Sequence, residues 1–260
     1  MTDLASPPAP SGGSTAPRRS RKWWYIGGVC VLVLALAGFG IWYFVFRDDS
    51  PAAVNIERAT ESLDTKGSGG AQPSSSLDGT WKVDSSIGSF ANFTSSFAGY
   101  RVQEELAGIG TNTAVGRTPD VSGSITIVGT KIPKAGFTAD LSTLKSDEGF
   151  RDDTIRHQAI ETDRFPKATF ELTEPIELDK IPAPGKKTAV DATGTLTLHG
   201  VTKDVTIPLV AERTGDTIAV TGQLDIPFAD YGIQQPTSFR VLSIEDHGIL
   251  EVQLFFTKSA

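Results

Sequence analysis

A run without charged side chains, from Trp23 to Phe46, constrains this chain more than any other feature. As an α-helix the run would extend about 36 Å, which exceeds the roughly 30 Å hydrocarbon core of a bilayer. Aromatic residues gather at both ends of a membrane helix, where they meet the lipid headgroups. Here they are Trp23, Trp24, Tyr25, Trp42 and Tyr43. The run therefore predicts one transmembrane helix over residues 23–46, with the membrane as a partner.

Charged residues beside the run predict its orientation. Four basic residues precede it, Arg18, Arg19, Arg21 and Lys22. The positive-inside rule then places the N-terminus in the cytoplasm and the chain from about residue 50 across the membrane. A cleaved signal peptide is the alternative, but the run exceeds the usual apolar core of about 7–15 residues and ends without small residues. We expect an uncleaved anchor in the bacterial cytoplasmic membrane and an extracytoplasmic C-terminal domain.

Composition divides the remainder of the chain. Residues 1–22 begin with a stretch rich in Pro, Ser, Ala and Gly, which predicts a disordered cytoplasmic tail. Residues 47–77 are similar and predict a flexible linker, with a transient helix at 54–63. Residues 78–260 form the main domain.

The main domain alternates apolar and polar residues with a period of two, which predicts antiparallel strands. The alternation is clear at 124–127, 168–172, 194–198, 205–209, 218–226 and 250–256. Ser146–Thr162 instead shows helical spacing and is followed by Pro166, a residue that ends helices. We expect an all-β fold, a sandwich or a closed barrel, with one short helix.

Several function classes are disfavoured. The formal net charge is −7, and the charged residues before position 48 are mostly basic. The main domain is therefore acidic. An acidic domain would repel the phosphates of a nucleic acid, so we do not expect a nucleic-acid partner. Asp153, His157 and Glu161 would share a helical face, but such charged faces are usually solvated, and we predict no metal site. The chain has no G-x-S-x-G elbow and no complete dinucleotide fingerprint. We therefore predict no enzyme, no catalytic residues and no cofactor.

Three blocks of sequence resemble the YceI-like family. The first is Trp81–Phe90, the second combines Arg151-Asp152 with Thr162–Phe170, and the third is Gly194–Lys203, which reads GTLTLHGVTK. The resemblance spans about 78–259. It implies an eight-stranded antiparallel barrel of lipocalin-like shape, found in periplasmic or secreted proteins. Some members of the family hold a polyisoprenoid or a prenylated quinone in the lumen.

The resemblance and the apolar strands together predict a membrane-tethered binding protein for an isoprenoid-type lipid held in the barrel lumen. The alternative is a structural or protein-interaction module of the cell envelope whose barrel is packed by its own side chains. The oligomeric state is left open. The candidate lining residues are Phe90, Phe93, Phe97, Phe137, Phe170, Leu196, Leu198, Phe228 and Phe239.

Overall fold

The computed structural model describes residues 31–40, 50–64, 76–236 and 241–259. The chain divides into two units, Met1–Arg47 and Asp48–Ala260. In the first unit residues 31–40 are helical, and the rest of the predicted membrane segment 23–46 lies outside the described residues, as does the predicted tail 1–22. Within the described part of the chain, no helix combines the length and the apolar character needed to cross a membrane.

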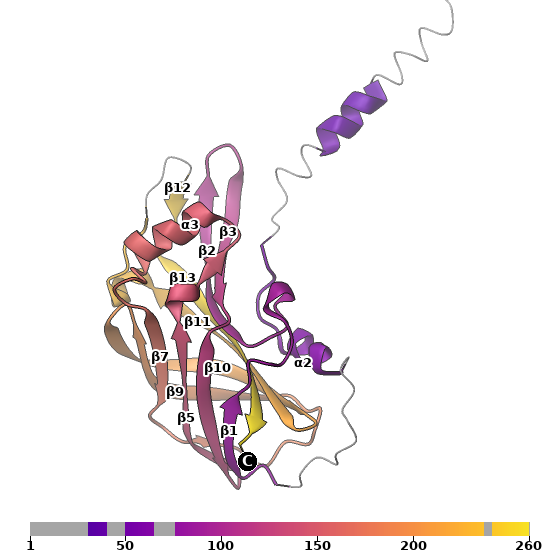
Figure 1. Ribbon diagram of the computed structural model, residues 1–260, viewed down its shortest axis with the longest axis vertical. Helices are drawn as coiled ribbons and strands as arrows, with labels where there is room; N and C mark the ends of the chain where they lie inside the picture. Colours follow the sequence, from indigo (N-terminus) through magenta and orange to yellow (C-terminus); the bar gives the residue numbers. More distant parts are fainter. Residues whose placement is uncertain (1–30, 41–49, 65–75, 237–240, 260) are drawn as a thin grey trace, which may run out of the picture. The chain divides into compact units, whose positions relative to one another are not determined.

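The second unit is built from antiparallel strands joined in one sheet (Figure 1). The strands are β1 Gly79–Val83, β2 Phe97–Leu106, β3 Gly110–Thr118, β4 Val121–Val128, β5 Lys131–Asp140, β6 Lys145–Ser146, β7 Lys167–Leu172, β8 Ile176–Glu177, β9 Thr188–Leu198, β10 Val201–Thr214, β11 Thr217–Pro227, β12 Val241–Ile244 and β13 His247–Lys258. The α-helices are α2 Ile56–Asp64 and α3 Gly149–Thr154. Shorter helical turns are η1 Phe90–Asn92, η2 Leu141–Thr143, η3 Ile155–Ala159 and η4 Phe228–Tyr231.

The sheet closes into a barrel because β1 pairs with β4 on one side and with β13 on the other. The order around the barrel is β1, β4, β5, β7, β9, β10, β11 and β13. Strand β13 pairs with β1 through Phe256–Lys258 and with β2 through Ile249–Gln253, so β2 takes the place of β1 toward the other end. The prediction of a closed eight-stranded antiparallel barrel is confirmed, and the sandwich alternative is wrong.

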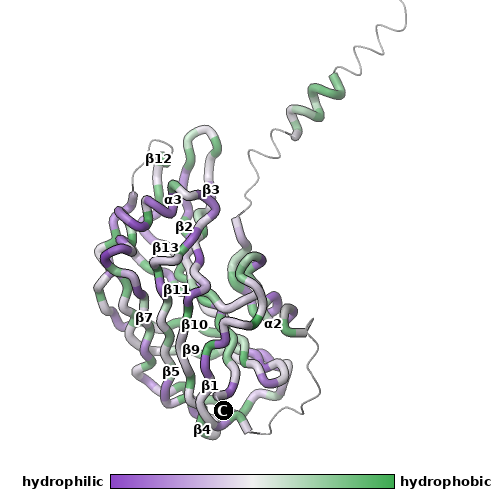
Figure 2. The backbone as a smooth tube through the Cα atoms, viewed as in Figure 1, coloured by the Kyte–Doolittle hydropathy of each residue, from purple (hydrophilic) through white to green (hydrophobic). Residues whose placement is uncertain are grey.

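Alternation along the strands decides which side chains enter the barrel. Hydrophobic and hydrophilic residues follow one another along the strands in Figure 2. Side chains such as Leu196, Ile207 and Val252 are buried in the core, each at 1% exposure or less. Trp81 is fully buried, and its indole Nε1–H donates to the carbonyl oxygen of Leu77 at 2.8 Å, which satisfies its polar atom.

The predicted short helix is present as α3 and continues into η3, a π-helical turn. Asp152 in its first turn accepts hydrogen bonds from the backbone N–H and the hydroxyl of Ser146, both at 2.7 Å. Ile155 and Ala159 are its buried side chains. The helix thus lies with one apolar edge on the barrel.

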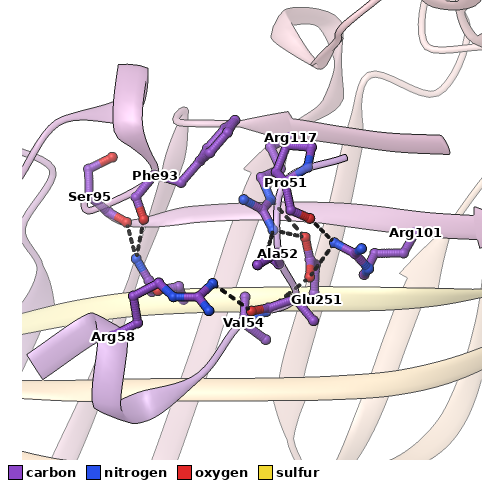
Figure 3. A network of polar contacts seen from close by, with 11 residues as sticks. Pro51, Ala52, Val54, Arg58, Phe93, Ser95, Arg101, Arg117 and Glu251 are labelled. Carbon is purple, nitrogen blue, oxygen red and sulfur yellow. Dashed lines mark hydrogen bonds and ion pairs between the residues drawn. The ribbon is translucent and has the colours of Figure 1, made fainter. Parts of the chain in front are cut away.

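Residues 50–64, which we call the docked segment, lie against the outside of the barrel (Figure 3). Two of their polar partners, Arg117 and Glu251, are buried, at 2% and 0% exposure. Arg117 Nε donates to Glu251 Oε1 at 2.7 Å, and Arg117 Nη2 donates to the carbonyl oxygen of Ala52 at 2.8 Å. Arg101 Nη1 donates to the carbonyl oxygen of Pro51 at 2.5 Å.

Apolar contacts hold the rest of the docked segment. Ile56 and Ala59 of α2 form a cluster with Ala219 and Phe255, which face outward from β11 and β13. This part of the expected flexible linker is therefore folded onto the barrel, and the short helix expected at 54–63 is ordered there as α2. Residues 65–75 of the linker lie outside the described residues.

Removing the Glu251 carboxylate tests the docking. In Glu251→Ala, Arg117 stays buried without its partner, and we expect a loss of about 3–5 kcal/mol in the free energy of unfolding, measured in urea. Hydrogen exchange of residues 50–64 should accelerate at the same time, because the Val54 N–H donates to Glu251 Oε2 at 3.3 Å. The control is Glu177→Ala, which removes an exposed pair with Lys131 and should cost about 0–1 kcal/mol. Equal losses in the two variants would contradict this account.

Candidate functional site

An apolar cavity of about 140 Å³ lies inside the barrel, at the end bordered by α3 and β12. We call it the first cavity. Its walls come from the inner faces of the strands and from one edge of the α3–η3 helix. The side chains that line it include Ala98, Tyr100, Val102, Phe137, Ile155, Ala159, Leu196, Leu198, Phe228 and Leu250. An apolar space of this kind favours an apolar occupant, because polar groups inside it would lose their hydrogen bonds to water.

A second apolar cavity, of about 130 Å³, lies further along the lumen. It is lined by side chains of β4, β5, β7 to β11 and β13, with Leu77 from the segment before β1. The lining includes Leu77, Ile125, Ile132, Phe137, Phe170, Ile176, Val190, Ile207, Leu209 and Leu254. The lumen is therefore hollow at two levels along its axis.

Phe137 is shared by the two cavities, and Phe170 lines the second. The Phe137 ring stacks on the Phe170 ring with a centroid distance of 5.8 Å and an interplanar angle of 25°. The Phe170 ring lies over Gly194 of the neighbouring strand, where an added Cβ would come within 2.7 Å of Phe170 Cζ. Glycine at 194 is thus required for the position of the Phe170 ring.

The structure places five of the nine predicted lining residues in the lumen. They are Phe137, Phe170, Leu196, Leu198 and Phe228. Phe239 lies outside the described residues.

Phe90, Phe93 and Phe97 line neither cavity and form an aromatic cluster with Arg117 instead. The Arg117 guanidinium carbon lies 4.4 Å from the ring centroids of both Phe93 and Phe97. Phe97 opens β2 opposite Gln253, on the outer side of the sheet, so the next residue, Ala98, faces the lumen. Sequence alternation did not reveal this, because the segment before Phe97 is not a strand.

Sequence reasoning missed Tyr100 and Val102, which line the first cavity from β2. The signal was present as alternation with the charged or polar Arg101 and Gln103, but this hairpin is polar enough overall to obscure it. It also missed Ile155 and Ala159, which line the cavity from η3. Helical spacing alone does not indicate which element a short helix covers.

A polar cluster borders the first cavity. Arg151 Nη2 pairs with Glu104 Oε1 at 2.7 Å, and Asn112 Nδ2 donates to the same carboxylate oxygen at 2.7 Å. Arg151 also pairs with Asp147. The Tyr100 hydroxyl is buried and has no hydrogen-bond partner among the described residues. Burial raises the pKa of this hydroxyl, so it stays protonated.

His199 ties the α3–η3 helix to the barrel. Its Nε2 lies 2.8 Å from Glu161 Oε2, just beyond the helix, and its Nδ1 lies 2.8 Å from the carbonyl oxygen of Tyr231. Both ring nitrogens thus lie within hydrogen-bond distance of an oxygen atom. His199 therefore links the helix that lines the first cavity to β9 and to η4.

The residues around His199 explain the HG dipeptide of the GTLTLHGVTK block. His199 and Gly200 form a two-residue loop between β9 and β10. The flanking residues, Leu198 of β9 and Val201 of β10, pair with each other. Both loop residues have positive φ, 51° and 74°, as a type I′ turn requires. An added Cβ at Gly200 would also lie 2.6 Å from Cε1 of the Phe165 ring, which packs edge-on against His199.

The charged face proposed from helical spacing is divided. Glu161 pairs with His199, whereas His157 Nδ1 lies 3.5 Å from Asp163 Oδ2 at the surface. Across the residues that the structure describes, no three His, Cys, Asp or Glu side chains gather as metal ligands would.

The sequence matches a known domain family, and the fold is similar to those of solved structures. Residues 81–256 match the YceI-like domain. A polyisoprenoid-binding domain from Saccharophagus degradans, implicated in plant cell wall breakdown, is similar with a TM-score of 0.51 and 20% identity, over 69% of this chain and 98% of that one. At this identity the likeness shows the fold alone. No curated protein sequence matches the chain.

Two further solved structures have lower scores. BcnA from Burkholderia cenocepacia has a TM-score of 0.48 and 19% identity, over 66% of this chain and 98% of that one. The YCEI protein of Campylobacter jejuni has a TM-score of 0.47 and 18% identity, over 56% of this chain and 85% of that one.

Replacing His199 tests its link to the helix. In His199→Asn the backbone can keep its positive φ, which asparagine tolerates, but the shorter side chain cannot bridge Glu161 and the Tyr231 carbonyl. We expect a loss of about 1–3 kcal/mol in the free energy of unfolding and faster hydrogen exchange in residues 149–160. His247→Asn, at a half-buried histidine of β13, is the control. Unchanged exchange in the helix of His199→Asn would contradict the link.

Proposed function

Because the chain belongs to the YceI-like domain family, we propose that its barrel binds an apolar lipid of the isoprenoid type, with the chain of the lipid in the lumen, beginning in the first cavity. The observation that carries the proposal is a closed barrel that is hollow and apolar inside. The Saccharophagus degradans domain of similar fold is described as polyisoprenoid-binding, which supports this class of ligand.

The lining of the first cavity suits a hydrocarbon chain. Each methylene group that leaves water for such a cavity contributes about 0.8 kcal/mol to binding. The charged side chains that line the cavity, Glu104 and Arg151, already pair with each other at its border. We place the polar head of the lipid at this border and its chain toward Phe137.

The two cavities favour binding over the alternative of a barrel packed by its own side chains. Packed protein cores contain few voids larger than a water molecule. Cavities of about 140 and 130 Å³ are too large to be ordinary packing defects. We propose that the lumen binds its ligand without catalysing a reaction.

The lipid would be taken from or delivered to the membrane that residues 23–46 are expected to cross. In this proposal the barrel is extracytoplasmic and tethered at the outer face of the bacterial cytoplasmic membrane. Near the start of the docked segment, the Pro51 carbonyl oxygen accepts a hydrogen bond from Arg101 of β2, and the next residue of β2, Val102, lines the first cavity. The tether would therefore reach the barrel beside the first cavity.

Binding is tested with a prenyl alcohol of fifteen carbons, farnesol, and the full-length protein in detergent. We expect saturable binding in isothermal titration calorimetry. The variant Ala159→Phe places a ring in the first cavity and should weaken binding about tenfold or more, which corresponds to about 1.4 kcal/mol. Native mass spectrometry of the protein purified from its membrane should show a co-purified prenyl lipid.

The matched control is Ala91→Phe, at an exposed residue in η1 away from both cavities. It should bind farnesol as the unaltered protein does, and circular dichroism should show both variants folded. Absence of binding to the unaltered protein, or equal binding by a folded Ala159→Phe, would exclude the proposed lumen site.

A further inference from the structure

The division of the lumen has a consequence for the length of chain that it accepts. The first and second cavities, about 140 and 130 Å³, share Phe137 in their linings, and its ring stacks on that of Phe170, which lines the second cavity. An apolar cavity of about 150 Å³ holds one benzene molecule, so each cavity here accommodates roughly one five- or six-carbon group. A prenyl chain of more than one unit therefore needs both cavities, and its path leads past the two rings.

The two rings differ in their freedom to move. The Phe170 ring is 4% exposed and lies over Gly194, with the backbone of β9 directly beneath it. Phe137 is only partly buried, and it lines both cavities. Phe137 is therefore the ring that has space on either side.

The neighbour of Phe137 on β4 adds to this freedom. Gly123 is paired directly with Phe137, so the two residues face the same side of the sheet. An added Cβ at Gly123 would lie 2.9 Å from the Cβ of Phe137. It would also lie 2.4 Å from the Gly136 carbonyl oxygen, so glycine at 123 allows β4 to approach β5 closely and places no side chain of that strand beside Phe137.

We propose that Phe137 determines the chain length of the ligand. This inference rests on the proposed binding of an isoprenoid-type lipid. Short prenyl chains occupy the first cavity while Phe137 remains stacked on Phe170. Longer chains enter the second cavity only after Phe137 turns aside, and the free energy of that rearrangement reduces their affinity.

The test compares prenyl alcohols of five and ten carbons, prenol and geraniol, in calorimetric titrations of the full-length protein, because the shorter fits one cavity and the longer needs both. The readout is the ratio of their dissociation constants, because Phe137 also contacts the short chain. In Phe137→Ala the passage is open, and the ratio should shift about tenfold or more in favour of the longer alcohol. In Phe137→Trp the larger ring should shift the ratio about tenfold against it, with the shorter alcohol still bound.

Phe150→Ala, at an exposed phenylalanine of α3 that lines neither cavity, is the matched control and should keep the ratio of the unaltered protein. If Phe137→Ala does not fold, Phe137→Leu repeats the measurement with a smaller loss of packing. An unchanged ratio in the folded alanine or leucine variant and in the tryptophan variant would overturn the role of Phe137 and leave the proposed function standing. Failure of the unaltered protein to bind either alcohol would overturn both.

Discussion

The pairing of β1 with both β4 and β13 is the contact on which the other features of the barrel depend. It joins the first strand of the sheet to the last, so that every strand of the ring has a neighbour on both sides. Once the ring is closed, the period-two alternation of each strand assigns its side chains to the lumen or to the outer surface. The apolar lumen and the buried charges outside it are two results of this single constraint.

Glycines on the inner face then shape the lumen. The ring of Tyr100 lies over Gly116, where an added Cβ would come within 2.3 Å of Tyr100 Cε1, and the ring of Phe170 lies over Gly194 in the same way. Large rings can lie flat against the wall only where the neighbouring strand carries no side chain. Space remains in the lumen because rings and glycines are paired across strands.

The sequence allowed the barrel to be predicted because its signal is local and repeated. Alternation along β9 to β13, the helix before Pro166 and the HG turn each follow from neighbouring residues. The direction of Phe97 and the docking of residues 50–64 depend instead on partners far along the chain. Glu251 is separated from Arg117 by 134 positions along the chain. A charged residue in a strand normally indicates a position that faces solvent. No local pattern in the residues before β1 indicates that Arg117 and Glu251 are covered.

The same separation of faces accounts for the chemistry of the lumen. Buried charges on the outer surface are acceptable because Arg117, Glu251 and the carbonyl oxygens of the docked segment satisfy one another. At the level of Phe137 the surrounding side chains are apolar, among them Ala192, Leu196 and Val252. A polar group of a ligand at this level would be buried without hydrogen bonds to these side chains, which is unfavourable. At the border of the first cavity it would instead lie near Glu104, Asn112 and Arg151. The barrel therefore favours a ligand with one polar end and a long apolar chain, held in one orientation.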